Sequence, residues 1–168
     1  MKAGLRWSFL SVALVGVIAL TPFRLLKVTG RSMEPTLRNG ETYVLDQVYW
    51  RNGGVKRRDI VVVRHMEEKW VKRLVGVPGD RLQIVYDDTG WITEISNLTE
   101  NPQLYEANAP GDERIVGPDE IFVIGDNLNH SADSTTQEAG AFKVRDIVGI
   151  VRTFTLQRNI PFRQHPGG

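Results

Sequence analysis

A serine that follows a glycine and precedes a proline turn is the first feature of the chain that could do chemistry. It is Ser32, in residues 30–37, and the surrounding turn can leave its hydroxyl exposed and its backbone N–H free. A nucleophile that supplies its own oxyanion donor needs both of these groups. The same composition is typical of an ordinary linker turn, and composition alone favours that alternative.

A lysine in an apolar strand could supply the base that such a serine needs. In residues 69–80, alternation places Trp70, Lys72 and Leu74 on one face of a strand and Arg73 on the other. Arg73 cannot lose its proton and must be paired or reach solvent, whereas burial lowers the pKa of a lysine. A neutral Lys72 would be a general base that works without a histidine. The alternative, a solvated lysine on an edge strand, is favoured by this segment taken alone.

A third stretch, residues 121–134, runs from an apolar strand into a turn dense with short hydrogen-bonding side chains. Turns of this composition can simply satisfy their own backbone. They can also hold a hydroxyl rigidly, and a serine held beside a buried amine would orient that amine. The stretch contains Ser131 together with Asp126 and Asp133.

Short runs rich in Val and Ile, separated by Pro and Gly turns, predict a mainly β domain that positions these stretches. The predicted strands are 42–46, 59–64, 70–77, 81–86, 91–95, 120–124 and 147–156. We assign the domain to residues 32–156, with a polar excursion or small cap at 87–118, and we expect a disordered tail at 157–168.

Residues 1–31 form a separate segment. No residue in 7–23 is charged, and as a helix these 17 residues would span about 25 Å, at the short end of the range for crossing a bilayer. An uncleaved membrane anchor is favoured over a removed signal peptide, whose cleavage site would be poor. It is also favoured over a soluble core helix, which should show a polar face. The flanking cations do not decide the orientation of an anchor.

Composition excludes several kinds of site and partner. The 168 residues carry a net charge of +1, but residues 1–31 hold five cations and no carboxylate, which leaves 16 basic against 20 acidic side chains in the remainder. An acidic domain argues against nucleic acid as the main partner. Because the chain has no cysteine and its three histidines are far apart in sequence, we expect no metal site and no cofactor.

Taken together and in this order, these stretches resemble the type I signal peptidase (leader peptidase) family. A Ser-Met-x-Pro-Thr-Leu motif stands at 32–37, an Asp-Ile-Val-Val strand at 59–62, Val-Lys-Arg with Gly-x-Pro-Gly-Asp at 71–80, and Gly-Asp-Asn with Ser-x-Asp-Ser at 125–134. Each motif is a weak signal by itself, but the whole set in order behind a membrane segment is a strong one. The match extends to about residue 151 and leaves 87–118 and the tail unmatched in detail.

The resemblance implies a serine endopeptidase that removes signal peptides from exported preproteins. It implies an antiparallel β domain outside the cytoplasmic membrane, held to the lipid bilayer by one transmembrane helix. Ser32 would be the nucleophile and its backbone N–H an oxyanion donor, Lys72 the general base, and Ser131 the residue that orients the lysine. Met33 and Leu37, beside the nucleophile, are expected to contact the substrate or the membrane.

Some positions depart from the pattern of the family. Gly30 stands where some members carry a hydroxyl as a second oxyanion donor, so the N–H of the nucleophile is expected to act alone or with another donor. Leu128 and Thr135 replace arginines that are common in the last motif. Asp126 and Asp133, which we regard as supporting residues, are therefore expected to lack ion-pair partners.

Two other functions remain open at this point. The first is a specialised relative that matures one dedicated secretion or conjugation substrate. The second is a catalytically silent, anchored assembly factor. The silent form is disfavoured because a scaffold has no physical need for a lysine on an apolar face. No oligomeric state follows from the sequence.

Overall fold

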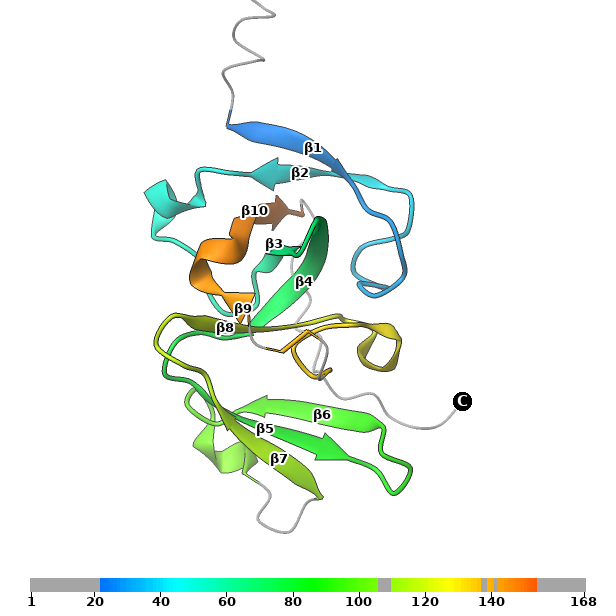
Figure 1. Cartoon of the computed structure of the whole chain (residues 1–168), viewed down its shortest axis with the longest axis vertical. Helices are drawn as coiled ribbons and strands as arrows, with labels where there is room; N and C mark the ends of the chain where they lie inside the picture. The colour runs from blue at the N-terminus through cyan, green and yellow to red at the C-terminus, as the bar shows by residue number, and fades with distance from the viewer. Residues whose placement is uncertain (1–21, 106–109, 137–138, 141, 154–168) are drawn as a thin grey trace, which may run out of the picture.

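Seven strands form the main sheet of the computed structural model, which describes residues 22–105, 110–136, 139–140 and 142–153 (Figure 1). Their spatial order is β1-β2-β10-β3-β4-β8-β9, and each neighbouring pair is antiparallel. The strands are β1 (Phe23–Lys27), β2 (Thr42–Asp46), β3 (Ile60–His65), β4 (Glu68–Gly76), β8 (Glu120–Ile124), β9 (Phe142–Lys143) and β10 (Ile147–Arg152). This order places β4 in the interior of the sheet, between β3 and β8.

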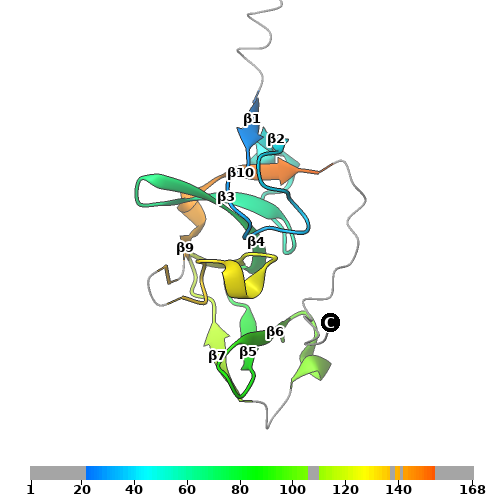
Figure 2. The same ribbon diagram turned by 90° about the vertical axis from the view of Figure 1, so that its right-hand side faces the viewer.

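A second, smaller sheet lies at the opposite end of the molecule from β1 (Figures 1 and 2). Its strands are β5 (Arg81–Tyr86), β6 (Ile92–Asn97) and β7 (Gly111–Ile115), in the order β6-β5-β7 and all antiparallel. The excursion predicted at 87–118 therefore contains two strands that pair with β5 on either side.

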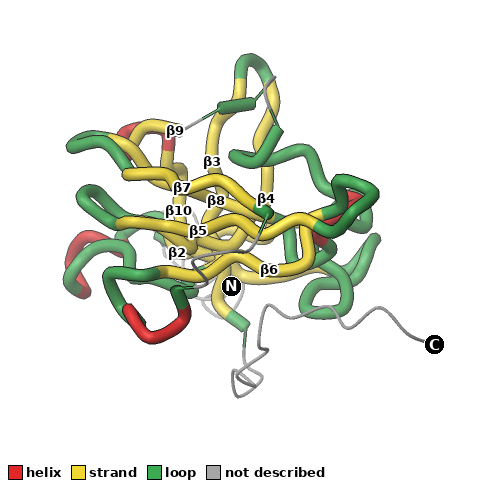
Figure 3. The backbone as a smooth tube through the Cα atoms, turned by 90° about the horizontal axis from the view of Figure 1, so that it is seen from below, coloured by secondary structure: helices red, strands yellow, loops and turns green. Residues whose placement is uncertain are grey.

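Helical structure in the described residues is confined to short 3₁₀ turns, which Figure 3 shows among the strands. The turns are η1 (Tyr49–Asn52), η2 (Pro102–Leu104), η3 (Leu128–His130) and η4 (Val144–Asp146). None of them has the length and apolar character needed to cross a bilayer. The predicted anchor helix lies almost entirely in residues 1–21, outside the described part of the chain.

Alternation along β3 divides the apolar core into two layers. Val61 and Val63 pack on one face of the main sheet with apolar residues of β4, β8 and β10. Ile60 and Val62 pack on the other face, where the segment at 28–37 covers the sheet. A third cluster joins the two sheets, and its buried members are Val75, Leu82, Ile84, Ile95, Val116, Phe122, Ile124 and Leu128.

The prediction of a mainly β, antiparallel fold is confirmed, and the strands at 42–46, 81–86 and 120–124 have the predicted bounds. The strands β1, β7 and β9 were not predicted. Strand β1 belongs to the range 1–31 that was assigned to the anchor and its juxtamembrane segment, so the sheet begins at Phe23. Its burial pattern explains the miss, because four of its five residues are exposed and show no alternation.

The prediction that Met33 and Leu37 contact the substrate or the membrane is wrong. Their exposed fractions are 1% and 0%, and both side chains pack into the cluster of Ile60 and Val62. The segment folds back on itself, since the N–H of Leu37 donates to the carbonyl of Met33 at 2.9 Å. Apolar side chains that neighbour Ser32 in the sequence can pack into the core and hold its segment in place. A sequence motif does not distinguish such buried residues from apolar residues exposed at the surface.

Candidate active site

The interior position of β4 buries both of its central cations. Lys72 and Arg73 have exposed fractions of 4% and 8%, and they point to opposite faces of the sheet. Their neighbours on β3 are Val61 and Ile60, respectively. The alternative of a solvated lysine on an edge strand is therefore excluded, and each cation needs a partner inside the protein.

The amine of Lys72 has one hydrogen-bond partner among the described residues, the hydroxyl of Ser131. The Nζ–Oγ distance is 2.8 Å. Burial lowers the pKa of Lys72 below its usual value, and the negative charge of Asp133 opposes that shift only in part. A desolvated amine that donates to a neutral hydroxyl can lose its proton far more readily than a lysine in water.

An aromatic ring of the same strand lies beside the amine and forms an apolar wall there. The Nζ atom of Lys72 lies 5.6 Å from the ring centroid of Trp70. The indole N–H of Trp70 donates to the carboxylate of Glu68 at 2.8 Å, and its ring packs against His65 with 4.2 Å between centroids. The ring is thus held in place, and it keeps water from one side of the lysine.

The turn after β8 is held together by the carboxylate of Asp133. This buried side chain accepts hydrogen bonds from the backbone N–H of Gly125 at 2.8 Å and from the N–H and hydroxyl of Thr135 at 3.1 and 2.7 Å. Ser134 ties the same turn to β8, because its hydroxyl accepts from the N–H of Val123 at 3.0 Å. The turn satisfies its own polar groups and also fixes the position of Ser131.

Ser32 lies against this turn, although it is about 100 positions away in the sequence. Its carbonyl oxygen accepts from the backbone N–H of Asn127 at 2.9 Å, and the side-chain amide of Asn127 donates to the carbonyl of Arg31 at 3.3 Å. A Cβ atom added to Gly125 would lie 2.3 Å from Ser131 Oγ and 2.5 Å from the carbonyl oxygen of Ser32. The two serines therefore meet over a glycine that leaves room for both.

The reactive groups of Ser32 are uncommitted within the described part of the chain. Neither its hydroxyl nor its backbone N–H has a hydrogen-bond partner there, and no hydrogen bond joins its Oγ to Lys72 Nζ. The N–H of Gly30 is engaged, because it donates to the side chain of Asn39 at 3.0 Å. A free hydroxyl and a free N–H on one residue, close to a buried amine, are what acyl transfer requires.

The expectation that Asp126 lacks an ion-pair partner is wrong. Arg73 reaches it across the sheet and donates from Nε and Nη2 to its two carboxylate oxygens, at 2.7 and 2.6 Å. The remaining Nη1 donates to the carbonyl of Arg58 at 2.7 Å. Arg73 thus supplies the positive charge that an arginine at position 128 would supply in other members of the family. Leu128 itself packs into the core between the two sheets.

Comparison with known proteins places the chain in a family. The family described as "Signal peptidase, peptidase S26" matches residues 1–156. The chain is 33% identical to signal peptidase I of Bacillus caldolyticus, over 97% of this chain and 94% of the relative. It is 35% identical to signal peptidase I P of Bacillus subtilis subsp. natto, over 84% and 81%, and 36% identical to signal peptidase I of Bacillus licheniformis, over 74% and 73%.

The chain belongs to the signal peptidase family, peptidase S26. It is accordingly a serine endopeptidase. The resemblance inferred from the motifs is confirmed. The roles of individual residues remain predictions. The structure joins Lys72 to Ser131 by a hydrogen bond and places the backbone of Ser32 beside Ser131 at Gly125.

Sequence reasoning passed over two residues of the candidate site. Asn127 holds the backbone on both sides of the Arg31–Ser32 peptide, and Trp70 shields the amine of Lys72. The signals were present in the sequence, because Asn127 belongs to the Gly-Asp-Asn turn and Trp70 shares the predicted face of Lys72. What was missing was the pairing of segments that makes each of them a neighbour of the reactive groups.

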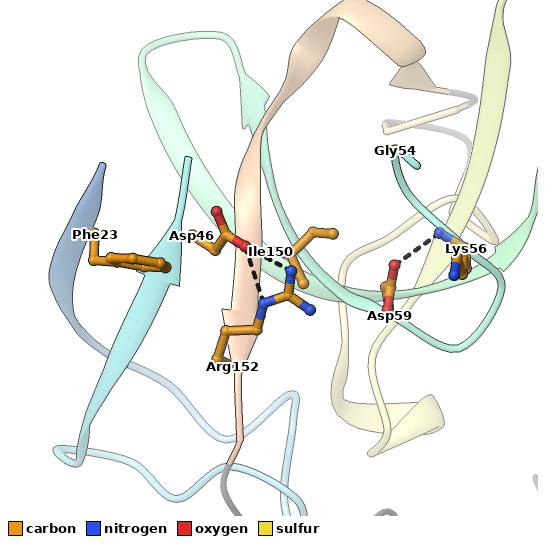
Figure 4. Close-up of a pocket in the computed structure, with 7 residues that line it drawn as sticks. All are labelled: Phe23, Asp46, Gly54, Lys56, Asp59, Ile150 and Arg152. Atoms are coloured by element: carbon orange, nitrogen blue, oxygen red, sulfur yellow. Dashed lines mark hydrogen bonds and ion pairs between the residues drawn. The ribbon is translucent and has the colours of Figure 1, made fainter. Parts of the chain in front are cut away.

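A pocket elsewhere on the domain is not lined by Ser32, Lys72 or Ser131. It is lined by Phe23, Asp46, Gly54, Lys56, Asp59, Ile150 and Arg152 (Figure 4). Arg152 donates to Asp46 at 2.5 and 3.1 Å, and the carboxylate of Asp59 accepts from the backbone N–H of Lys56 at 2.7 Å. Arg152 and Asp46 are engaged with each other, and we take the two serines and the lysine as the candidate groups for the chemistry of the peptidase. The described residues contain no cluster of ligands that could hold a metal ion.

Proposed function

We propose that this protein cleaves signal peptides from exported preproteins, with Ser32 as the nucleophile and Lys72 as the general base. The observation that carries the assignment is the buried amine of Lys72, fixed 2.8 Å from Ser131 Oγ in a site next to the backbone of Ser32. The names of the relatives, signal peptidase I, supply the substrate class.

The proposed reaction begins with attack by Ser32 Oγ on the scissile carbonyl carbon. The hydroxyl proton passes to the neutral amine of Lys72 as the C–O bond forms, and the resulting oxyanion accepts a hydrogen bond from the N–H of Ser32. The protonated amine then gives that proton to the departing nitrogen as the C–N bond breaks, which leaves an ester on Ser32. A water molecule, activated by the same amine, hydrolyses the ester and restores both groups.

Ser131 would hold the amine in this reaction. A lysine side chain has a flexible stem of four carbons, so an Nζ atom without a hydrogen-bond partner would sample many positions. The hydrogen bond to Ser131, together with the wall of Trp70, reduces that freedom. We therefore assign Ser131 as a positioning residue, and Asp126 and Asp133 as supports of the turn that carries it.

The site of action is proposed to be the membrane surface. Residues 1–31 would anchor the chain as a single-pass segment, with the β domain on the extracytoplasmic side, where exported preproteins emerge. The concentration of five cations and no carboxylate in this segment, ahead of an acidic domain, agrees with such a division.

Processing of a preprotein by the full chain in detergent or lipid vesicles tests the proposed function. Ser32→Ala and Lys72→Met should each lower the rate by at least about 1,000-fold, since each removes a group that makes or breaks bonds. Lys69→Met is the matched control, because Lys69 is an exposed lysine of the same strand, and it should process normally. Normal processing by Lys72→Met would contradict the assignment of the base.

The range of substrates needs a separate experiment. A panel of unrelated preproteins, incubated with the unaltered chain, should be cleaved throughout if the protein is a general signal peptidase. Cleavage of a single member would show instead a dedicated maturation enzyme. Absence of cleavage across the panel, with the protein folded, would contradict the proposed function.

A further inference from the structure

The hairpin between β5 and β6 ends in a rigidly built turn. The carboxylate of Asp87 accepts hydrogen bonds from the N–H and hydroxyl of Thr89 and from the N–H of Trp91, at 2.9, 2.6 and 2.9 Å. The N–H of Asp87 also donates to the carbonyl of Trp91 at 2.9 Å, and Gly90 supplies the left-handed conformation with φ of 85°. This network fixes the main chain of Trp91.

The ring of Trp91 stands beside the candidate active site. It lies perpendicular to the imidazole of His130, with 6.2 Å between the ring centroids and 89° between the planes. His130 directly precedes Ser131, the residue that accepts the hydrogen bond from Lys72. Strands β6 and β7 of the second sheet belong to residues 87–118, which the motifs of the family do not match in detail. The hairpin of this sheet places an aromatic side chain next to the turn that carries Ser131.

Packing of the two sheets does not explain this ring. The turn η3 is attached to the second sheet by Leu128, which is 4% exposed and lies among Leu82, Ile84 and Phe122. Trp91, by contrast, is 47% exposed, and His130 is also exposed. An indole left half in water beside groups that act on a peptide offers apolar surface to that peptide.

We propose that Trp91 and His130 form a subsite for an apolar side chain of the substrate, so that Trp91 is a specificity residue of the enzyme. The proposal rests on the proposed function and adds to it a contact outside the catalytic groups. Two aromatic rings at a right angle leave a corner with one face and one edge free to receive an aliphatic or aromatic side chain.

The position of this side chain in the substrate follows from reach. The ring centroids of Trp91 and His130 are 6.2 Å apart, and His130 is the chain neighbour of Ser131. With the imidazole side chain and the step of about 3.8 Å between consecutive Cα atoms included, the Trp91 ring lies no farther than about 14 Å from the Cα atom of Ser131. An extended peptide advances about 3.3 Å per residue. The subsite should therefore receive a residue within about four positions of the bond that is cleaved.

A cycle of paired substitutions in enzyme and substrate tests the subsite. Substrate peptides carry Leu, Ala or Asp in turn at each position within about four residues of the scissile bond, and kcat and KM are measured for the full chain and for Trp91→Ala. At one position, Leu→Ala in the substrate should raise KM about tenfold with the unaltered enzyme and less than about twofold with Trp91→Ala. The value of kcat and the acid limb of the pH profile should stay unchanged.

Two further variants guard against trivial effects. Trp50→Ala removes a more exposed tryptophan, 60% exposed on η1, and should behave as the unaltered enzyme. Trp91→Phe keeps a ring on the same hairpin and should give KM values between those of the unaltered chain and of Trp91→Ala. An unchanged melting temperature in both Trp91 variants shows that the hairpin remains folded.

The outcomes separate the subsite from the proposed function. Equal KM values for Trp91→Ala and the unaltered chain at every position would overturn the subsite while leaving signal-peptide cleavage intact. A lowered kcat with a displaced acid limb would also overturn it, because Trp91 would then act through Ser131 as a positioning residue. Failure of the unaltered chain to cleave any of the peptides and preproteins would overturn both proposals.

Discussion

Lys72 shows at the scale of one residue how a fold can change the chemistry of a side chain. A lysine in water is a cation, but at Lys72 the surrounding strands remove the water and leave a hydroxyl as hydrogen-bond partner. Burial is the largest cause of the lowered pKa, and the attraction of Asp133 is too weak to reverse it. The neutral form, which can accept a proton, is thereby stabilised relative to the charged form.

The pH dependence of activity should report this lowered pKa. The neutral amine is the active form, so kcat/KM should fall as pH drops through the pKa that Lys72 has in the folded protein. This acid limb should be centred below the ordinary lysine value of about 10.4. The measurement is a pH profile of kcat/KM on a short peptide whose own groups do not titrate in the range. A limb centred near the ordinary value would contradict the desolvated base.

The same pKa makes a prediction about stability. Because the folded-state pKa lies below the unfolded one, the unfolded chain binds more protons between the two values, and the free energy of unfolding falls as pH decreases through that window. Lys72→Met removes the group and should stabilise the protein below about pH 10, by an amount that grows with decreasing pH until the folded-state pKa is passed. Urea unfolding at several pH values measures it, with Lys69→Met as the unaffected control.

Strand β4 shows at the scale of an element how two adjacent cations can be buried for different purposes. Alternation sends Lys72 to one face and Arg73 to the other, and the two faces offer different partners. Lys72 donates a hydrogen bond to the neutral hydroxyl of Ser131, whereas Arg73 forms a bidentate ion pair with the carboxylate of Asp126. The first arrangement favours loss of a proton, and the second holds a permanent charge that ties β4 to the turn after β8.

Removal of one member of the ion pair should be costly. The side chains of Arg73 and Asp126 are only 9% and 4% exposed, so Asp126→Ala leaves a buried charge without compensation. We expect a loss of about 3–5 kcal/mol in the free energy of unfolding, measured by urea denaturation. The exposed pair of Arg81 and Glu113, at 54% and 40%, provides the control, and Glu113→Ala should cost about 1 kcal/mol or less. Similar losses for the two variants would show that the Arg73 pair is not buried in solution.

At the scale of the whole molecule, the proposed catalytic groups lie where separate parts of the chain converge on one sheet. Ser32 comes from the segment that covers one face, Lys72 from the interior strand, and Ser131 from the turn next to the second sheet. Ser32 is followed by side chains of the core, because Met33 and Leu37 are buried under the sheet. The core thus holds in place the segment that carries Ser32.

This arrangement predicts that Leu37 contributes to folding and does not act as a membrane contact. Leu37→Ala should lower the free energy of unfolding by about 2–5 kcal/mol, because the side chain is fully buried. Leu25→Ala, at a leucine that is 80% exposed on β1, should change it by less than about 0.5 kcal/mol. Denaturant unfolding of both variants decides the point, and a small effect at Leu37 would argue for a surface position.

The sequence by itself determined the family and the mainly β class, and it supplied the candidate residues of the site. Local patterns carry this information, since strands such as 81–86 and 120–124 alternate or run apolar between turns. Motif order was sufficient to single out Ser32, Lys72 and Ser131. Local patterns did not predict β1 and β7, because the residues of these strands are largely or wholly exposed. Their strand character comes from pairing with a neighbouring strand.

Only the tertiary structure decided which of these groups are buried and which of them meet. An interior place for β4 depends on hydrogen bonds to β3 and β8, and these long-range pairings leave no local trace in the sequence. The tertiary structure also gives Asp126 its ion-pair partner, Arg73, and it buries Met33 and Leu37. Desolvation, which lowers the pKa of Lys72, is a property of the assembled surroundings, so only the fold makes this amine easier to deprotonate than a lysine in water.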